Sequence, residues 1–245
     1  MTRVPIATER VWSVIAVWFA VTGCATHSPL VHQQCYNADV QLGHELRELE
    51  EHRAKGCTTE LSRGGGSECD RLELEIARLA IVCPGHAPTL MANAVIAYDN
   101  HRPSEAQQYL DQILSQSRPY PDAAVLRAQI ALEEGNVPFA RRLVEQEILL
   151  VPDHAGLHEM RAAIFFLDRR LDDARNELAR AEALGAPRWR VAYHLGVIEE
   201  LSGRPEEAAR LYMEALQGNP DWAAADSRLR ALRAAGSAPT AVSPR

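Results

Sequence analysis

The sequence predicts an all-α protein: a right-handed α-solenoid of about four helix-turn-helix repeats with a C-terminal cap helix, preceded by a disulfide-linked helical hairpin. The first observation is a 34-residue period, in which alanine recurs at Ala106, Ala140, Ala174 and Ala208. The second is that two further registers share this period: small residues at Ala94, Ala128, Ala162 and Gly196, and isoleucine at Ile96, Ile130, Ile164 and Ile198. The third is a group of four cysteines ahead of the repeats.

The first 23 residues have the pattern of a signal peptide. Arg3 and Arg10 flank the amino end of an apolar run over residues 11–21, which is about half the length needed to cross a bilayer. The run ends at Val21-Thr22-Gly23-Cys24, which resembles the lipobox of bacterial lipoproteins. That resemblance implies cleavage before Cys24 and lipid attachment to it. The alternatives are an ordinary secretory peptide with a free Cys24, or an uncleaved buried segment.

Residues 24–34 form a short lipid-proximal linker, and residues 35–86 are predicted to form the hairpin. Its first helix carries Val40, Leu42, Leu46 and Leu49 and can stop at Gly56; its second starts near Ser67 and ends before Pro84. In an antiparallel pair the cysteines at matching ends meet, which favours the nested disulfides Cys57–Cys69 and Cys35–Cys83. Four cysteines allow three connectivities, so the pairing is a hypothesis that rests on the hairpin.

The repeats are predicted at residues 87–120, 121–154, 155–188 and 189–222. Each unit holds two stretches with helical periodicity, for example 189–201 and 205–216, and Pro205 stands where a helix can begin without its N–H. Such a pair cannot bury its apolar face alone, so the units must stack. Residues 223–235 are predicted to form the cap helix, and residues 236–245 are expected to be a disordered tail.

Composition and motifs argue against several kinds of site. The net charge of −7 becomes −8 without residues 1–23, which hold two arginines and one glutamate, so a nucleic-acid binder is disfavoured. The cysteine spacings do not suit zinc, and His154 with His158 is interpreted as a solvated pair rather than a metal site. No catalytic motif is present, so the sequence predicts a protein that is not an enzyme and has no cofactor and no metal.

The last unit resembles the tetratricopeptide repeat, on Leu195-Gly196, Ala208, Tyr212, Ala215 and Pro220. It departs from the family pattern at Ala192 and Glu199, where aromatic residues are usual. In this family the first helix of each repeat lines a concave face that binds protein partners. The resemblance therefore implies a partner-binding face with a largely apolar lining at Met91, Val95, Tyr98, Val125, Leu132, Ala163, Phe166, Tyr193 and Val197, with Gln129, Glu159 and Glu200 among them.

An apolar lining with few acids suits an amphipathic helix or an extended apolar segment of a protein partner. Arg190 is the only basic neighbour, which disfavours capture of a partner's carboxylate. The alternative is that the cap helix or the hairpin fills the trough and makes these residues core.

The predicted function is a membrane-tethered adaptor. By resemblance to lipoproteins, Ala25 after the lipidated cysteine favours the outer membrane, facing the periplasm. The architecture is similar to that of the pilotins, which help type IV pilus secretins to assemble. Three readings stay open: an assembly factor for an outer-membrane complex, a passive envelope scaffold or oligomerisation module, and a noncatalytic subunit of an envelope enzyme.

Overall fold

The computed structural model describes residues 35–57 and 66–237, and the regular secondary structure of this part of the chain is all α-helix. The hairpin comprises α2 (Ala38–Ala54) and α3 (Glu68–Val82). Four helix pairs follow, and α12 (Ala223–Ser237) ends the fold. The pairs are α4 (Ala87–Asp99) with α5 (Pro103–Leu114), α6 (Pro121–Glu133) with α7 (Val137–Leu150), α8 (Ala155–Leu167) with α9 (Leu171–Ala183), and α10 (Arg188–Leu201) with α11 (Pro205–Gly218).

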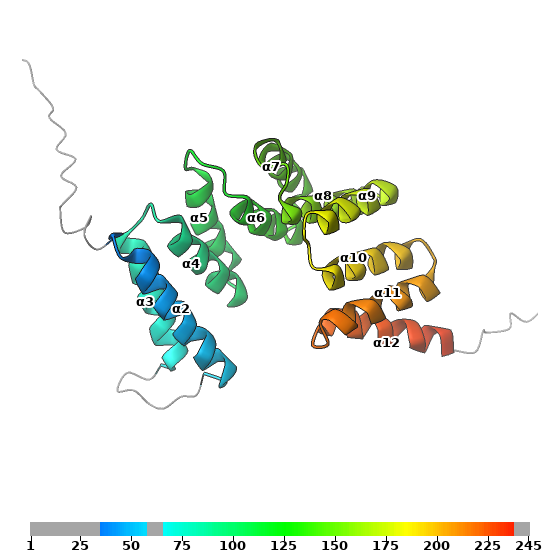
Figure 1. Cartoon of the computed structure of the whole chain (residues 1–245), viewed down its shortest axis with the longest axis horizontal. Coiled ribbons are helices and arrows are strands. Elements are labelled where there is room, and N and C mark those ends of the chain that lie inside the picture. The colour runs from blue at the N-terminus through cyan, green and yellow to red at the C-terminus, as the bar shows by residue number, and fades with distance from the viewer. Residues whose placement is uncertain (1–34, 58–65, 238–245) are drawn as a thin grey trace, which may run out of the picture.

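The pairs stack into an arch, with the hairpin at one end and α12 at the other (Figure 1). The predicted fold class, an α-solenoid with a cap helix and a disulfide-linked hairpin, is confirmed. The cap helix extends to Ser237, two residues beyond the predicted end at 235. None of the helices in the described ranges is long and apolar enough to cross a bilayer. Cys24, the linker and most of the predicted tail lie outside those ranges.

Small residues let the two helices of a pair approach closely. The four alanines of the first register are completely buried, and so are Ala94 and Ala128. In the last pair a Cβ placed on Gly196 would lie 2.6 Å from Cε1 of Tyr212, which is itself fully buried. Glycine is needed at Gly196 because no side chain fits between α10 and the ring of Tyr212.

The turns inside the four pairs share one backbone conformation. His101, Gly135, Arg169 and Gly203, which stand 34 residues apart, all have positive φ. At each turn the positive-φ residue and the residue after it donate their backbone N–H groups to carbonyls near the end of the first helix. In the second pair, Gly135 N–H donates to the Leu132 carbonyl (3.0 Å) and Asn136 N–H donates to the Ala131 carbonyl (2.7 Å). This Schellman arrangement ends the helix and reverses the chain. Glycine adopts the positive φ of this turn without strain, whereas at His101 and Arg169 the same φ is unfavourable for a residue with a side chain.

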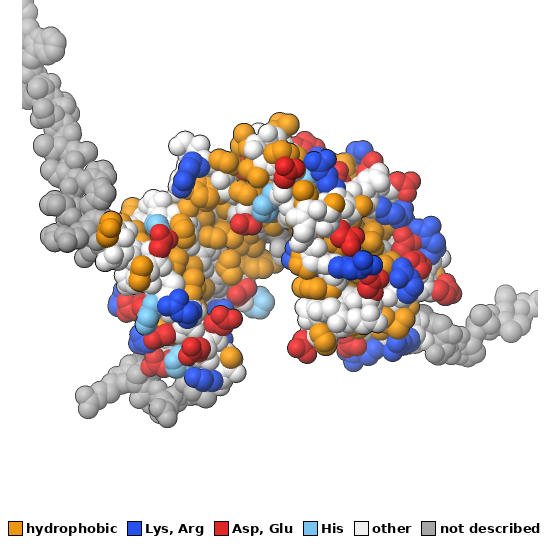
Figure 2. All heavy atoms as spheres, viewed as in Figure 1, with side chains coloured by type: hydrophobic (Ala, Val, Ile, Leu, Met, Phe, Trp, Pro, Cys, Tyr) orange, Lys and Arg blue, Asp and Glu red, His pale blue; other side chains and the backbone are white. Residues whose placement is uncertain are grey.

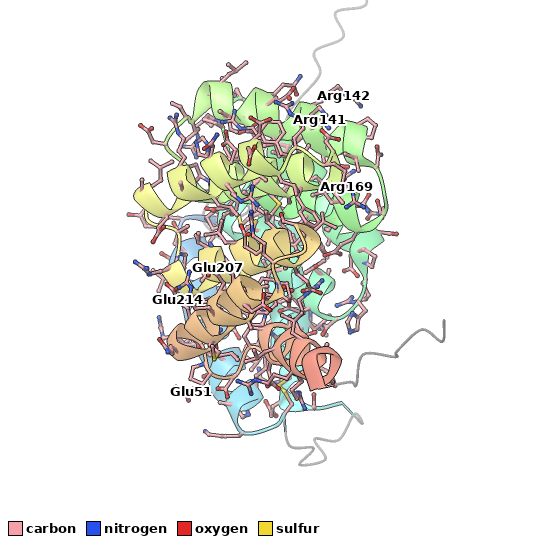
Figure 3. All side chains as sticks on the ribbon, turned by 90° about the vertical axis from the view of Figure 1, so that its right-hand side faces the viewer. Glu51, Arg141, Arg142, Arg169, Glu207 and Glu214 are labelled. Carbon is pink, nitrogen blue, oxygen red and sulfur yellow. A yellow bond between two sulfur atoms is a disulfide. The ribbon has the colours of Figure 1, made fainter. Side chains whose placement is uncertain are left out.

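A polar contact repeats between successive pairs. Arg141 of α7 donates to Asp168 at the end of α8 (2.5 Å). The positions one repeat earlier and later do the same: Gln107 donates to Glu134 (2.6 Å) and Arg175 donates to Ser202 (3.1 Å). Arg141 lies on the outer surface of the arch (Figure 3). These contacts tie each second helix to the following pair, outside the apolar core.

Two disulfides hold the hairpin. Cys35 is bonded to Cys83 with a Cα–Cα distance of 5.5 Å, and Cys57 is bonded to Cys69 at 5.6 Å, which is the nested pairing expected from an antiparallel hairpin. The hairpin is joined to the first repeat by Asn93, whose buried Nδ2 donates to the carbonyl of Ile76 (3.1 Å). The arch is therefore continuous from the hairpin into the repeats.

The four large apolar residues of α2 do not all face the core. Leu42 and Leu49 are buried against α3, but the Val40 side chain is 75% exposed and Leu46 is 37% exposed. Ala38, Leu42 and Leu49 are the buried residues of α2, and they form the side that packs against α3 and α4. Val40 points away from that side.

Candidate functional site: the concave face

The concave face is built from the first helices of the repeats. In α6 and α8 three positions, spaced four and three residues apart, line the inside of the arch: Val125, Gln129 and Leu132 in α6, and Glu159, Ala163 and Phe166 in α8. Hydrophobic side chains gather on this side in Figure 2, with acidic side chains beside them. Because helix pairs stack with a small rotation between them, these positions form one continuous hollow surface.

Two adjoining cavities occupy this surface. We call the larger one, of about 670 Å³, the concave groove; it is lined by residues of α6, α8 and α10 together with Trp222. We call the smaller one, of about 210 Å³, the apolar pocket; it lies between α8, α9 and α10, with Arg228 of α12 at its rim. Ala163, in the middle of α8, lines both cavities. A larger side chain at Ala163 would therefore obstruct both.

The nine residues predicted to bind a partner do not all meet in these cavities. Those that line the groove or the pocket come from α6, α8 and α10: Val125, Leu132, Ala163, Phe166, Tyr193 and Val197. Met91 lies in a separate cavity of about 200 Å³ beside Ile113 and Tyr120, and Val95 is 38% exposed. Tyr98 reaches the groove through hydrogen bonds to its residues. None of the nine is fully buried, so the hairpin and the cap helix do not turn them into core.

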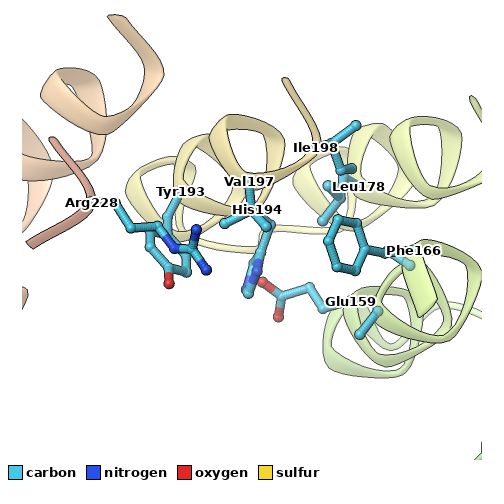
Figure 4. A pocket seen from close by; sticks show the side chains of 10 residues that line it. Glu159, Phe166, Leu178, Tyr193, His194, Val197, Ile198 and Arg228 are labelled. Atoms are coloured by element: carbon cyan, nitrogen blue, oxygen red, sulfur yellow. The ribbon is translucent and has the colours of Figure 1, made fainter. Parts of the chain in front are cut away.

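The apolar pocket is shown in Figure 4. Phe166, Leu178 and Ile198 lie on one side of it, Tyr193 and Arg228 on the other, and His194 and Glu159 between them. Leu229 and Leu232 of α12 pack with Tyr193 and Val197, so the cap helix forms one edge of the pocket and leaves its mouth open. A cavity of this volume is smaller than a typical small-molecule site, and fits one or two side chains of a partner.

The acidic side chain at the centre of the concave face is neutralised by an arginine. Glu159, 7% exposed, accepts two hydrogen bonds of 2.7 Å from Nε and Nη2 of Arg190. This is the bidentate geometry that arginine and carboxylate form best. Glu200, at the other side, accepts from Tyr212 (2.7 Å) and Arg228 (3.1 Å). Neither carboxylate is free to attract a charged partner.

The end of the groove nearest the first repeat is acidic. The Glu133 carboxylate accepts from the Tyr98 hydroxyl (2.5 Å) and from the Gln129 amide (3.1 Å), both of which are neutral donors. At the opposite end of α6, Asp122 accepts from His154 (3.0 Å). Burial, together with the bond to Glu133, raises the pKa of Tyr98 to about 12, so the phenol stays protonated as a donor. A basic side chain of a partner would be favoured at this end.

The groove favours the neutral form of His194. Burial lowers the pKa of the imidazole; Glu159 acts in the opposite direction, and Arg190 adds to the lowering. The pocket therefore presents an apolar surface, and its charged side chains, Glu159 and Arg228, are paired within the protein. An apolar side chain can enter it without stripping water from an unpaired charge.

Sequence reasoning missed two residues on this face, Trp222 and Arg228, and misinterpreted His158 of α8. Arg228 and Trp222 come from the cap helix and the turn before it, and their approach to α10 depends on how α12 packs, which the repeat pattern does not specify. Trp222 stacks on Tyr193 with ring centroids 4.8 Å apart. The interpretation of His158 as a solvated residue was wrong: it is 1% exposed, and its ring nitrogens contact Glu177 (2.7 Å) and the carbonyl of Pro152 (2.8 Å).

Comparisons with known proteins identify the repeats. Two models of the tetratricopeptide repeat match residues 97–164 and 168–223, together about half of the chain. Among curated proteins, none matches this sequence.

Solved structures show the same fold at low sequence identity. A thermophilic TPR protein of Thermus thermophilus aligns with a TM-score of 0.63 and 17% identity, over 79% of this chain and 99% of its own. PilF of Pseudomonas aeruginosa aligns with a TM-score of 0.58 and 13% identity, over 83% of this chain and 90% of its own. A chain of the APC/C hetero-tetramer Cut9-Hcn1 aligns with a TM-score of 0.61 and 11% identity over 69% of this chain, which spans only 34% of that longer chain.

Tetratricopeptide repeats are generally protein-interaction adaptors whose concave surfaces bind partners. The residues that the family models match lie among the four stacked helix pairs and end at the first residue of α12. The chain belongs to the tetratricopeptide repeat family.

Proposed function

We propose that the concave face holds a segment of a protein partner, with a bulky apolar side chain in the apolar pocket and a basic side chain at the acidic end of the groove. The observation that carries this proposal is that the lining is apolar, only partly buried, and open between α8 and α12. Buried aromatic or aliphatic anchors supply most of the binding energy in protein interfaces. The neutralised Glu159 and the neutral form of His194 suit such an anchor.

The chain acts as a membrane-tethered adaptor in this proposal. Cys24 carries the lipid, residues 25–34 form the tether, and the repeats face the periplasm from the outer membrane. The adaptor helps an outer-membrane complex, such as a type IV pilus secretin, to assemble. Support comes from the lipobox-like segment Val21-Thr22-Gly23-Cys24 and from the adaptor architecture. The similarity to PilF extends to the fold alone.

Crosslinking in native membranes tests the partner. Ala163→Arg places a long side chain where both cavities meet, and we expect it to abolish capture of the partner while the fold is retained. The matched control is Leu149→Arg on α7, because Leu149 is 83% exposed and lies outside both cavities. Undiminished capture by a folded Ala163→Arg protein contradicts the proposed groove.

The identity of the captured protein separates the readings. A secretin or an outer-membrane barrel protein supports an assembly factor, self-association alone supports a scaffold, and a soluble enzyme supports a noncatalytic subunit. The anchor is tested separately with Cys24→Ser, which should leave an uncleaved or soluble species. Recovery of correctly processed Cys24→Ser protein in the outer membrane at the normal level would overturn the lipid anchor.

A further inference from the structure

Three side chains that can ligate a metal ion lie together on α2, outside the concave face. His44, Glu45 and Glu48 offer an imidazole nitrogen and two carboxylates, and one such atom from each lies within 4.8 Å of the other two. This is the only group of its kind in the described ranges. The expectation from the sequence that the chain binds no metal rested on the cysteine spacings and on His154 with His158, and it did not include this group.

The spacing on the helix brings the first and last of these side chains to one face. His44 and Glu48 are four residues apart, and side chains at that separation are neighbours on an α-helix. Nε2 of His44 lies 3.4 Å from Oε1 of Glu48. Two ligands of a tetrahedral zinc ion, each bound at about 2.0–2.2 Å, are themselves about 3.4 Å apart. An ion therefore fits between these two side chains without any change in the helix.

The third side chain carries a buried oxygen that nothing in the protein satisfies. Glu45 continues the buried side of α2, because it stands between Leu42 and Leu49 at helical spacing. Its side chain is 15% exposed, and Oε1 lies 4.0 Å from Nδ1 of His44. Oε2 is buried and has no hydrogen-bond partner. Burial of an ionised carboxylate is costly unless a hydrogen bond, a counter-charge or a metal ion compensates it.

The nearest basic side chain does not supply that compensation. Arg71 of α3 directs its Nε to Glu68 (2.8 Å), and its Nη2 stays 3.9 Å from Oε2 of Glu48. That separation is too long for a hydrogen bond. Arg71 therefore reduces the repulsion between the two carboxylates of the group without satisfying the buried oxygen of Glu45.

We propose that His44, Glu45 and Glu48 bind one Zn²⁺ ion on the surface of the hairpin. An imidazole combined with carboxylates suits zinc, whereas Mg²⁺ and Ca²⁺ prefer ligand sets made of oxygen alone. Three ligands from the protein leave the fourth position of a tetrahedral ion to water or to a side chain of another protein. The site lies on a different helix from the concave face and does not depend on the function proposed for that face.

Calorimetric titration of the full chain with Zn²⁺ tests the site. The ligand variants are His44→Gln and Glu48→Gln, and the matched controls are His52→Gln and Glu51→Gln, which make the same changes on α2 outside the group. Glu48→His is a further variant, because it keeps a metal ligand at the same position while it removes the negative charge. Each titration is repeated in a large excess of Mg²⁺, and far-UV circular dichroism confirms that each variant is folded.

We expect the unchanged protein to bind one Zn²⁺ per chain at this site, with or without Mg²⁺. His44→Gln and Glu48→Gln should weaken that binding at least tenfold, whereas Glu48→His and both controls should retain it. No saturable binding, or normal binding by folded His44→Gln protein, would overturn the proposal. Loss of binding in Mg²⁺, or an equal loss in Glu51→Gln and Glu48→Gln, would also overturn it, because either result indicates attraction of cations by the acidic surface alone.

Discussion

The contact between Gly196 and Tyr212 offers a sharp test of how the repeats pack. Gly196→Ala adds a Cβ that would lie 2.6 Å from Cε1 and 2.8 Å from Cδ1 of Tyr212. Atoms this close must move apart, yet the ring is fully buried and its hydroxyl donates to Glu200 (2.7 Å), so it has little room to shift.

The expected magnitude follows from two opposing effects. Overpacking a filled core costs about 1–3 kcal/mol, whereas replacing a helical glycine by alanine gains about 0.5–1 kcal/mol. The variant should therefore lose up to about 2.5 kcal/mol of unfolding free energy and should not gain any. The matched control is Gly43→Ala in α2, where the nearest atom is Nη1 of Arg47 at 3.6 Å, an ordinary contact. The control should gain about 0.5–1 kcal/mol.

Urea denaturation followed by far-UV circular dichroism measures both changes. A double-mutant cycle isolates the contact, because Gly196→Ala is also measured in a protein that carries Tyr212→Leu. That protein lacks the ring, so Gly196→Ala should stabilise it by about 0.5–1 kcal/mol. Stabilisation of the otherwise unchanged protein by Gly196→Ala, similar to that of Gly43→Ala, would refute the close packing of α10 on α11.

Three further predictions concern stability. Burial raises the pKa of Glu147, whose Oε2 has no hydrogen-bond partner, so Glu147→Leu should stabilise the protein by about 1–3 kcal/mol at pH 7. Because a raised carboxyl pKa destabilises the ionised folded state, this gain should shrink as the pH falls through that pKa towards 4.5; melting curves with an equal gain at every pH contradict it. Arg169 has φ +63°, so Arg169→Gly should raise the free energy of unfolding by roughly 1 kcal/mol. Gly135 has φ +78°, so Gly135→Ala should lower it by a similar amount. Urea denaturation measures both changes, and changes of the opposite sign would exclude the shared turn. Cys35→Ser with Cys83→Ser opens a 48-residue loop and should cost about 4 kcal/mol, and an unchanged denaturation midpoint would argue against the bridge.

The fold could be predicted from the sequence because its information is local and repeated. A 34-residue period in small residues and isoleucine specifies two helices per unit, and the units must stack to bury their apolar faces. The turn position that recurs every 34 residues was not predicted at His101 and Arg169, because neither residue is glycine. Both nevertheless share the positive φ of Gly135. When a histidine or an arginine adopts a positive φ, the residue type does not reveal that conformation in the sequence.

The concave face could be predicted only in part. The three positions per first helix follow from helical periodicity, so Val125, Ala163 and Phe166 were identified from the sequence. The ion pair between Glu159 and Arg190 joins two different repeats, and it depends on side-chain placement that periodicity does not determine. For the same reason, Glu159 was interpreted as one of the acids in the lining, although Arg190 neutralises it.

The last measurement tests whether the concave face selects an apolar segment with a basic flank. Peptides are selected from a random display library on the purified protein, and their affinities are measured for the unchanged protein, for Ala163→Glu and for the control Leu149→Glu. We predict that the selected peptides combine a bulky apolar residue with lysine or arginine, that Ala163→Glu weakens their binding at least tenfold without changing thermal unfolding, and that Leu149→Glu leaves it unchanged. Selection of acidic peptides, or equal binding by folded Ala163→Glu protein, would contradict the account.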